Sequence, residues 1–221
     1  MKIFKKRVPQ KIGNWSLESN SQGELLVGGV STVELAEAYQ TPLHVVNKSG
    51  LQATCRSINH AFGNYSGKVS IHFAFKCNPV PAIIRIIKDS GINAEVMSSH
   101  ELKLALSLGF KGKEIVVNGP YKIDSLLKEC LEADVRAINV DSLEELMRLN
   151  RMAAGMNKKA NVLLRINPGY IPAGMNSGSA TSSRRNSLFG LDLKGGEVQQ
   201  ALELIKKLES VNFKGYHFHI G

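Results

Sequence analysis

A single lysine follows an apolar run in the first half of the chain. The run IHFAF, residues 71–75, leads directly into Lys76, and Pro79 stands shortly after it. Apolar residues at consecutive positions predict a strand buried on both faces, as in parallel sheets. A lysine held among apolar neighbours loses solvation, so its neutral amine becomes available to condense with the carbonyl of an aldehyde cofactor. The simpler interpretation is a lysine whose stem lies on the sheet while its ammonium group reaches water.

Strand and helix patterns alternate after residue 42 and place this lysine at a strand end. We expect successive strands to end at Lys76, Met97, Asn118, Val140 and Ile166. The spacing, 21 to 26 residues by subtraction, holds one strand, one helix and two short loops. Such units build a barrel or an open doubly wound sheet, and barrels carry their chemistry at the carboxyl ends of the strands. No G-x-G-x-x-G sequence follows the first strand, so we favour an α/β fold of the (β/α)8 TIM-barrel type.

The predicted barrel is incomplete. About six of the eight strands can be counted, and the last of them, GYHFHIG, ends the sequence. Residues 1–41 have a different pattern, which predicts a small β segment of a second domain and a helix leading into the barrel, while residues 42–221 form the partial barrel. Six strands would leave two long parallel edges unpaired, so we expect a fragment of a longer protein.

Composition argues against several classes of protein. The net charge of +9 accompanies no dense basic run with interleaved aromatics, so we expect no nucleic-acid partner. No apolar run is long enough for a membrane span. Three cysteines without a C-x-x-C pair argue against a disulfide framework or a metal site and fit a reducing, cytoplasmic compartment. Residues 146–191 contain basic residues and no acid, which favours either a phosphate or carboxylate ligand or a solvated surface.

Six motifs in order resemble those of the fold-type III pyridoxal-phosphate decarboxylases, most closely the diaminopimelate decarboxylase group. HFAFKCNP is similar to the lysine motif of that family, and EVMSSHEL to its D-V-x-S-x-x-E-L sequence. The other four are GELLVGGVSTVELAEAYQTPLHVVN, INVDSLEEL, LLRINPG and GYHFHIG. Together they extend from about residue 23 to the end, and a match of this length is specific where one motif would not be.

The resemblance implies a set of site residues. Lys76 would hold pyridoxal 5′-phosphate as a Schiff base, and His219 of the HIG sequence would stack on the cofactor ring. Glu95 stands where the family usually has aspartate, and Arg165 lies at the end of the fifth strand, where it would support the cofactor. Gly221, the last residue of HIG, completes the cofactor-binding set. The catalytic pair would be Lys76 and His219, and no metal is implied.

The resemblance also implies a reaction. It is the α-decarboxylation of an amino acid, most closely that of meso-diaminopimelate to L-lysine and CO₂, by a homodimer of the full-length protein. We expect the 221-residue chain alone to be poorly active. The substrate stays open among diaminopimelate, ornithine-, lysine- or arginine-like and carrier-linked amino acids, since Leu188 stands where the family commonly has lysine. A racemase of the same fold type and a non-catalytic barrel that binds the cofactor or regulates a partner are the alternatives.

Overall fold

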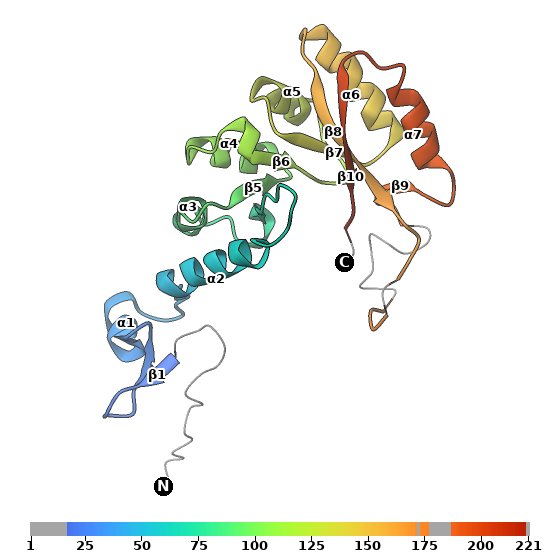
Figure 1. The fold of residues 1–221 in the computed structure, drawn as a ribbon. Helices are drawn as coiled ribbons and strands as arrows, with labels where there is room; N and C mark the ends of the chain where they lie inside the picture. Colours follow the sequence, from blue (N-terminus) through green and yellow to red (C-terminus); the bar gives the residue numbers. More distant parts are fainter. Residues whose placement is uncertain (1–16, 172, 177–186, 220–221) are drawn as a thin grey trace. The chain divides into compact units, whose positions relative to one another are not determined.

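The computed structural model describes residues 17–171, 173–176 and 187–219 (Figure 1). Contacts between residues group the chain into two compact units. One unit holds residues 1–71 and 85–92, and the other holds residues 72–84 and 93–221. This grouping differs from a division after residue 41, which stays a prediction.

The first unit contains a small antiparallel sheet and two helices. Its elements are β1 (Leu17–Ser19), β2 (Leu25–Val27), β3 (Val30–Ser31), α1 (Thr32–Tyr39) and α2 (Lys48–Ala61), with the strands paired in the order β1-β2-β3. Ser31 begins α1, because its hydroxyl oxygen accepts a hydrogen bond from the backbone N–H of Val33 at 3.1 Å. Asn47 begins α2 in the same way through the N–H of Gly50. Side-chain acceptors at both helix starts satisfy N–H groups that have no partner inside the helix.

The second unit is built on a parallel sheet. Its strands are β4 (His72–Ala74), β5 (Asn93–Val96), β6 (Ile115–Val117), β7 (Ala137–Val140), β8 (Ala160–Asn167), β9 (Leu191–Asp192) and β10 (Val211–His217). The order across the sheet is β4-β5-β6-β7-β8-β10, every pair is parallel, and the short β9 pairs with β8. The strands therefore lie side by side in the order in which the chain makes them.

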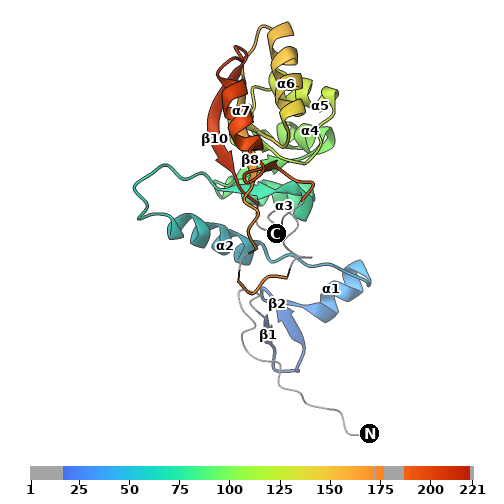
Figure 2. The same ribbon diagram turned by 90° about the vertical axis from the view of Figure 1, so that its right-hand side faces the viewer.

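Helices cover the sheet along one face. They are α4 (Ser99–Ser107), α5 (Asp124–Glu132), α6 (Leu143–Gly155) and α7 (Glu197–Ile205), with 3₁₀ turns η2 (Phe75–Cys77) and η3 (Gly112–Glu114), while α3 (Pro81–Asp89) is divided between the two units. Each of α4, α5 and α6 contacts the next helix in the chain, and Figures 1 and 2 show α4 to α7 following one another along the curved sheet. A doubly wound sheet would reverse its strand order and place helices on both faces. Sequential order with one helical layer is the arrangement of a TIM-type barrel, and six of its strands are present.

The core lies between the strands and these helices. Strand residues such as Val117, Val140 and Leu164 are fully buried, as are Leu127 and Leu149 on the helices. All four residues of β7 are buried, as expected for a parallel strand covered on both faces.

The first barrel strand corrects one sequence-based expectation. We predicted a strand buried on both faces that runs to Phe75, but β4 ends at Ala74 and its three residues are only half-buried. Only Phe75 of the next turn is fully buried, and its ring packs edge-on against Phe110 at a centroid distance of 6.0 Å. Lys76 is exposed, so it does not have the apolar surroundings that the sequence suggested. The physical reason is position, since β4 ends the sheet order and pairs with β5 alone among the described strands.

Reciprocal caps shape two of the turns that leave the sheet. The hydroxyl of Ser98 accepts from the N–H of Glu101, whose carboxylate in turn accepts from the N–H of Met97 at 2.7 Å. Ser142 and Glu145 repeat the pattern at the start of α6. Both pairs have the capping-box spacing seen in the sequence, and each fixes the turn from a strand into its helix.

No helix of the described residues is long and apolar enough to cross a membrane.

Candidate active site

A pocket of about 330 Å³ opens within the second unit, at the carboxyl ends of the parallel strands. The residues that line it come from the ends of β4, β5, β6, β8 and β10 and from the loops that follow them: Lys76, Glu95, Met97, Asn118, Gly119, Pro120, Arg165, Phe189 and His219. Four of the five site residues predicted from the sequence therefore line one pocket. The fifth, Gly221, lies outside the described residues.

Lys76 presents an accessible amine to this pocket. It is the middle residue of η2, directly after β4, and its side chain is exposed. Within the described part of the chain its amine forms no hydrogen bond and no ion pair. A primary amine without a competing partner can react with the carbonyl of a ligand that enters the pocket.

Histidines reach the same region from the end of β10. Burial lowers the pKa of His219, the positive charges of Arg165 and Lys76 lower it further, and Glu95 opposes them. For His217, burial and the charges of Arg165, His219 and Lys122 lower the pKa to about 4. Both imidazoles are therefore uncharged at neutral pH, and a neutral ring can lie against an aromatic ligand without the cost of burying a charge.

A carboxylate and an amide are paired on the neighbouring strands. The side-chain N–H of Asn118 donates to Oε1 of Glu95 at 3.0 Å, and the backbone N–H of Asn118 donates to the carbonyl of Val96. Glu95 is half-buried and stands beside Ala74 in the register of β4 and β5. Ala74 precedes Lys76 by two residues, so the hydrogen bond from Asn118 holds the Glu95 carboxylate near the start of the Lys76 turn. A negative charge is therefore available there to a cationic group of a ligand.

Arg165 forms the opposite part of the pocket. It is 4% exposed at the end of β8, and its Nη1 donates to Oδ1 of Asp141 at 3.0 Å. Its guanidinium lies over the ring of Phe189, 5.0 Å from the ring centre. The second oxygen of Asp141 accepts from the backbone N–H of Gly190 at 3.0 Å. A buried guanidinium with a planar neighbour and a paired carboxylate is held in one orientation.

Sequence reasoning missed three of the residues that build the pocket or hold it. Phe189 and Gly190 follow a long polar segment with no periodic pattern, and nothing in the local sequence points to the pocket. Asp141 belongs to the INVDSLEEL motif, but sequence reasoning gave it no role in the site. The available signal was its place directly after a predicted strand end at Val140, where parallel folds collect their polar groups.

A family model matches most of this chain. Residues 48–221 match the model described as pyridoxal-dependent decarboxylase, pyridoxal binding domain. The chain therefore belongs to the pyridoxal-dependent decarboxylases, and the matched part corresponds to the domain that binds pyridoxal in that family.

The similar proteins include diaminopimelate decarboxylases. The enzyme from Methanocaldococcus jannaschii is 33% identical over 214 residues, which are 95% of this chain and 48% of that protein. The enzyme from Bacillus methanolicus is 33% identical over 202 residues, 91% of this chain and 46% of that protein. The chain thus spans about half the length of the curated relatives it matches.

Solved structures match in the same way. A crystal structure of the M. jannaschii diaminopimelate decarboxylase has a TM-score of 0.87 at 34% identity and covers 96% of this chain and 49% of that chain. A second structure of that enzyme, in co-complex with L-lysine, has a TM-score of 0.82 at 31% identity and covers 93% and 48% of the two chains. The predicted fold class, a partial barrel of fold-type III decarboxylases, is confirmed.

Proposed function

We propose that this chain is the cofactor-binding part of a pyridoxal-phosphate-dependent decarboxylase that converts meso-diaminopimelate to L-lysine and CO₂. The observation that carries the proposal is the accessible amine of Lys76, without a partner among the residues that the structure describes, in a pocket shared with Glu95, Arg165 and His219. The relatives named diaminopimelate decarboxylase support the reaction, and the related structure in co-complex with L-lysine supports the product.

The residues present fit such a cofactor. Lys76 would bind its aldehyde carbon, the uncharged imidazole of His219 would lie against the ring, and Glu95 and Arg165 would meet its polar atoms. When bound, pyridoxal phosphate supplies a conjugated ring that accepts the electron pair left by the departing carboxylate. Gly221 stays a proposed member of this set.

The pocket residues attach the cofactor, exclude water and place charges around it. Lys76 would hold the cofactor through its aldehyde carbon, and its amine would be free in the pocket once a substrate amine takes that place. His219 excludes water from one face of the pocket, while Glu95, oriented by Asn118, holds a negative charge near Lys76. Arg165 supplies a fixed positive charge to an anionic group. Positioning of this kind contributes much of the rate in cofactor enzymes, because the reacting bond must have one orientation relative to the ring.

The proposal extends to the assembly and its place in the cell. We propose a small-molecule amino acid as substrate, a homodimer as the working form and the cytoplasm as the compartment. The resemblance to the family supports the dimer, and three cysteines without a disulfide, all free in the structure, support a reducing compartment.

A second candidate function is a barrel that binds the cofactor without catalysing decarboxylation. The observation that favours it is the pocket shared by Lys76, Glu95, Arg165 and His219, which supports cofactor binding whether or not decarboxylation follows. The two functions share the Lys76 chemistry and differ in turnover.

One set of proteins tests both cofactor binding and decarboxylation. Titrated with pyridoxal phosphate, the wild-type chain should develop an absorbance band above ~400 nm that Lys76→Ala removes. Lys128→Ala is the matched control, because Lys128 is an exposed lysine on α5 paired with Glu132. Release of CO₂ and L-lysine from meso-diaminopimelate that depends on Lys76 supports the decarboxylase. A Lys76-dependent band without CO₂ release supports the binding barrel, and a band unaffected by Lys76→Ala contradicts both.

A further inference from the structure

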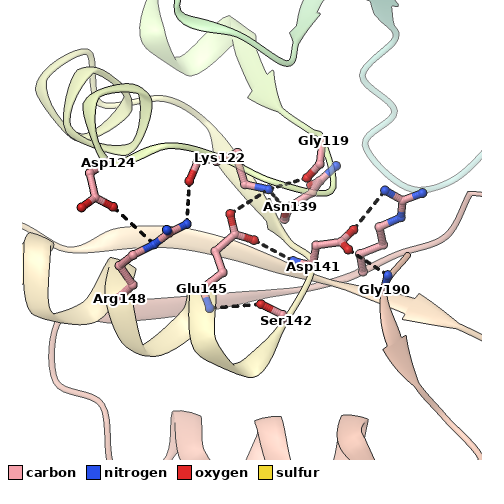
Figure 3. A network of polar contacts seen from close by, with 10 residues as sticks. Gly119, Lys122, Asp124, Asn139, Asp141, Ser142, Glu145, Arg148 and Gly190 are labelled. Carbon is pink, nitrogen blue, oxygen red and sulfur yellow. Dashed lines mark hydrogen bonds and ion pairs between the residues drawn. The ribbon is translucent and has the colours of Figure 1, made fainter. Parts of the chain in front are cut away.

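A row of buried charges lies beside the pocket. Lys122, Asp141, Glu145 and Arg165 are 0%, 6%, 4% and 4% exposed, and Figure 3 shows the contacts that connect Lys122, Glu145 and Asp141. Charged side chains are rarely buried to this extent, because removing them from water costs several kcal/mol each unless every charge is paired and hydrogen-bonded. Replacing a buried ion pair by well-packed apolar residues of similar volume is often neutral or stabilising in proteins. The row therefore calls for an explanation other than stability.

Lys122 begins the row at the wall of the pocket. Its Nζ donates to the carbonyls of Gly119 at 2.7 Å and Asn139 at 2.8 Å, and it pairs with Oε1 of Glu145 at 3.0 Å. Two of these contacts are hydrogen bonds, and the third is an ion pair between buried charges. Gly119 lines the pocket, so Lys122 connects the pocket wall after β6 to the end of β7 and the start of α6.

Glu145 connects Lys122 to the turn that carries Asp141. Its Oε2 accepts from the backbone N–H of Asp141 at 2.8 Å, while its own N–H donates to the hydroxyl of Ser142. The two carboxylate oxygens therefore face different elements, one toward Lys122 and one toward the turn that carries Asp141. This arrangement fixes the backbone of that turn from both sides.

The Asp141 carboxylate joins two parts of the pocket. Oδ1 accepts from Arg165 and Oδ2 accepts from the N–H of Gly190, each at 3.0 Å. Gly190 has a φ of +75°, and a Cβ there would lie 3.0 Å from the carbonyl oxygen of Arg165. The chain next to Phe189 therefore has to approach the end of β8 closely, and glycine permits both the conformation and the contact.

Asp141 itself does not line the pocket, but Arg165 and Phe189 do. The start of α6 is already capped by Ser142 and Glu145, so the helix does not need a carboxylate at this position. Within the described part of the chain, the Asp141 side chain accepts hydrogen bonds from the pocket wall, at Arg165, and from the segment that returns to it, at Gly190. Its charge is directed at the pocket rather than at the helix.

We propose that Asp141 is a positioning residue, which holds the Arg165 guanidinium and the Phe189–Gly190 segment together as one wall of the cofactor pocket, and that the Lys122–Glu145 ion pair fixes its place. The identity of the ligand rests on the proposed function, whereas the positioning itself is a property of the chain without ligand. The test therefore includes one measurement with pyridoxal phosphate and one without it.

The ligand-free measurement is an NMR titration of His219 in wild type and Asp141→Asn. Burial and the Arg165 charge lower the pKa of His219. If Asp141 offsets the Arg165 charge, its neutralisation should lower the pKa of His219 further. If Asp141 only stabilises the fold, loosening the site should admit water and raise that pKa toward its ordinary value. The two roles predict opposite signs, and an unchanged or raised pKa would overturn the proposal.

The second measurement is the affinity for pyridoxal phosphate. Asp141→Asn should weaken binding by about ten-fold, the effect of about 1.4 kcal/mol, because Arg165 and Phe189 lose their common restraint. The matched control is Asp134→Asn, which removes an exposed carboxylate paired with Lys113 before β7, at the other end of the strands. Equal affinities of Asp141→Asn and wild type would contradict the positioning role. Absence of a Lys76-dependent band in wild type would contradict the proposed function alone, since the His219 titration still tests Asp141.

Discussion

At the scale of single residues, two lysines near strand ends of one sheet have different contacts. The amine of Lys122 is fully buried, with two hydrogen-bond acceptors and an ion-pair partner, whereas that of Lys76 is exposed and has no partner among the described residues. A nucleophilic amine has to give up a proton, and at Lys122 this would leave the buried Glu145 carboxylate without its counter-charge. Both residues are lysines, so their contacts decide their roles. Lys76 can react with a ligand, whereas Lys122 can hold the neighbouring segments in place.

The residue scale also gives a prediction for pH. Burial and nearby positive charges lower the pKa of His217 from 6.5 to about 4, so the folded chain keeps this imidazole neutral where the unfolded chain protonates it. The stability of the fold should therefore fall as pH drops from about 6.5 to about 4, by on the order of 2 kcal/mol from this residue, and then stop changing on its account. Urea unfolding at a series of pH values measures this.

The variant His217→Gln should flatten that pH dependence, because it removes the group that takes up the proton in the unfolded state. His100→Gln is the control, since His100 is an exposed histidine on α4 in the same unit. A pH profile that stays the same in His217→Gln would show that other groups cause the acid sensitivity.

At the scale of elements, the turns after β5 and β7 have the same design. In each, a serine caps the helix and a glutamate three residues later bonds the backbone just before that serine. The first turn follows Glu95 of β5, which lines the pocket, and the second turn contains Asp141, which bonds to the pocket residue Arg165. The two caps therefore hold the backbone next to both residues. When both the serine and the glutamate of a capping box form their hydrogen bonds, the backbone between the strand end and the helix has little conformational freedom.

The variant Ser98→Ala should destabilise the second unit by about 1 kcal/mol, because the N–H of Glu101 loses its acceptor. Ser107→Ala is the control at the end of the same helix, where the hydroxyl donates to the carbonyl of Leu104 on the surface. Chemical denaturation compares the two variants, and an equal loss of stability in both would contradict a specific role of the cap.

Elements were the scale at which the sequence was most informative. The strand ends expected at Met97, Asn118 and Val140 lie close to the observed ends of β5, β6 and β7, because buried parallel strands have continuous apolar runs that a turn signal closes. The prediction that β4 is buried on both faces was wrong, because a local pattern cannot show which strand will end the sheet. Contacts such as Asp141 with Gly190 join residues 49 apart and depend on the register of several strands, which no local pattern encodes.

At the scale of the whole molecule, the positive charge is spread rather than directed at one ligand. The acid-free segment 146–191 contributes Arg165 to the pocket, but Lys158 donates to the carbonyl of Leu131 in the last turn of α5, and Arg148 pairs with Asp124. Among the described basic residues of that segment, Arg165 lines the pocket, so the anion-binding interpretation stays a prediction for this residue, whereas Lys158 and Arg148 have partners within the protein.

The two edges of the parallel sheet lead to the last prediction. β4 pairs only with β5, and β10 only with β8, among the described strands, and Tyr216 on β10 is 46% exposed. A row of unpaired backbone N–H and carbonyl groups with an exposed aromatic side chain is a template for pairing with another strand. The purified chain should therefore associate as its concentration rises, and analytical ultracentrifugation should show the average mass increasing. Tyr216→Lys should reduce this association, because charge on an edge strand opposes pairing. Leu106→Lys, at a partly exposed site on α4, is the control and should leave it unchanged. A mass independent of concentration, or equal association of both variants, would show that the sheet edges do not drive it.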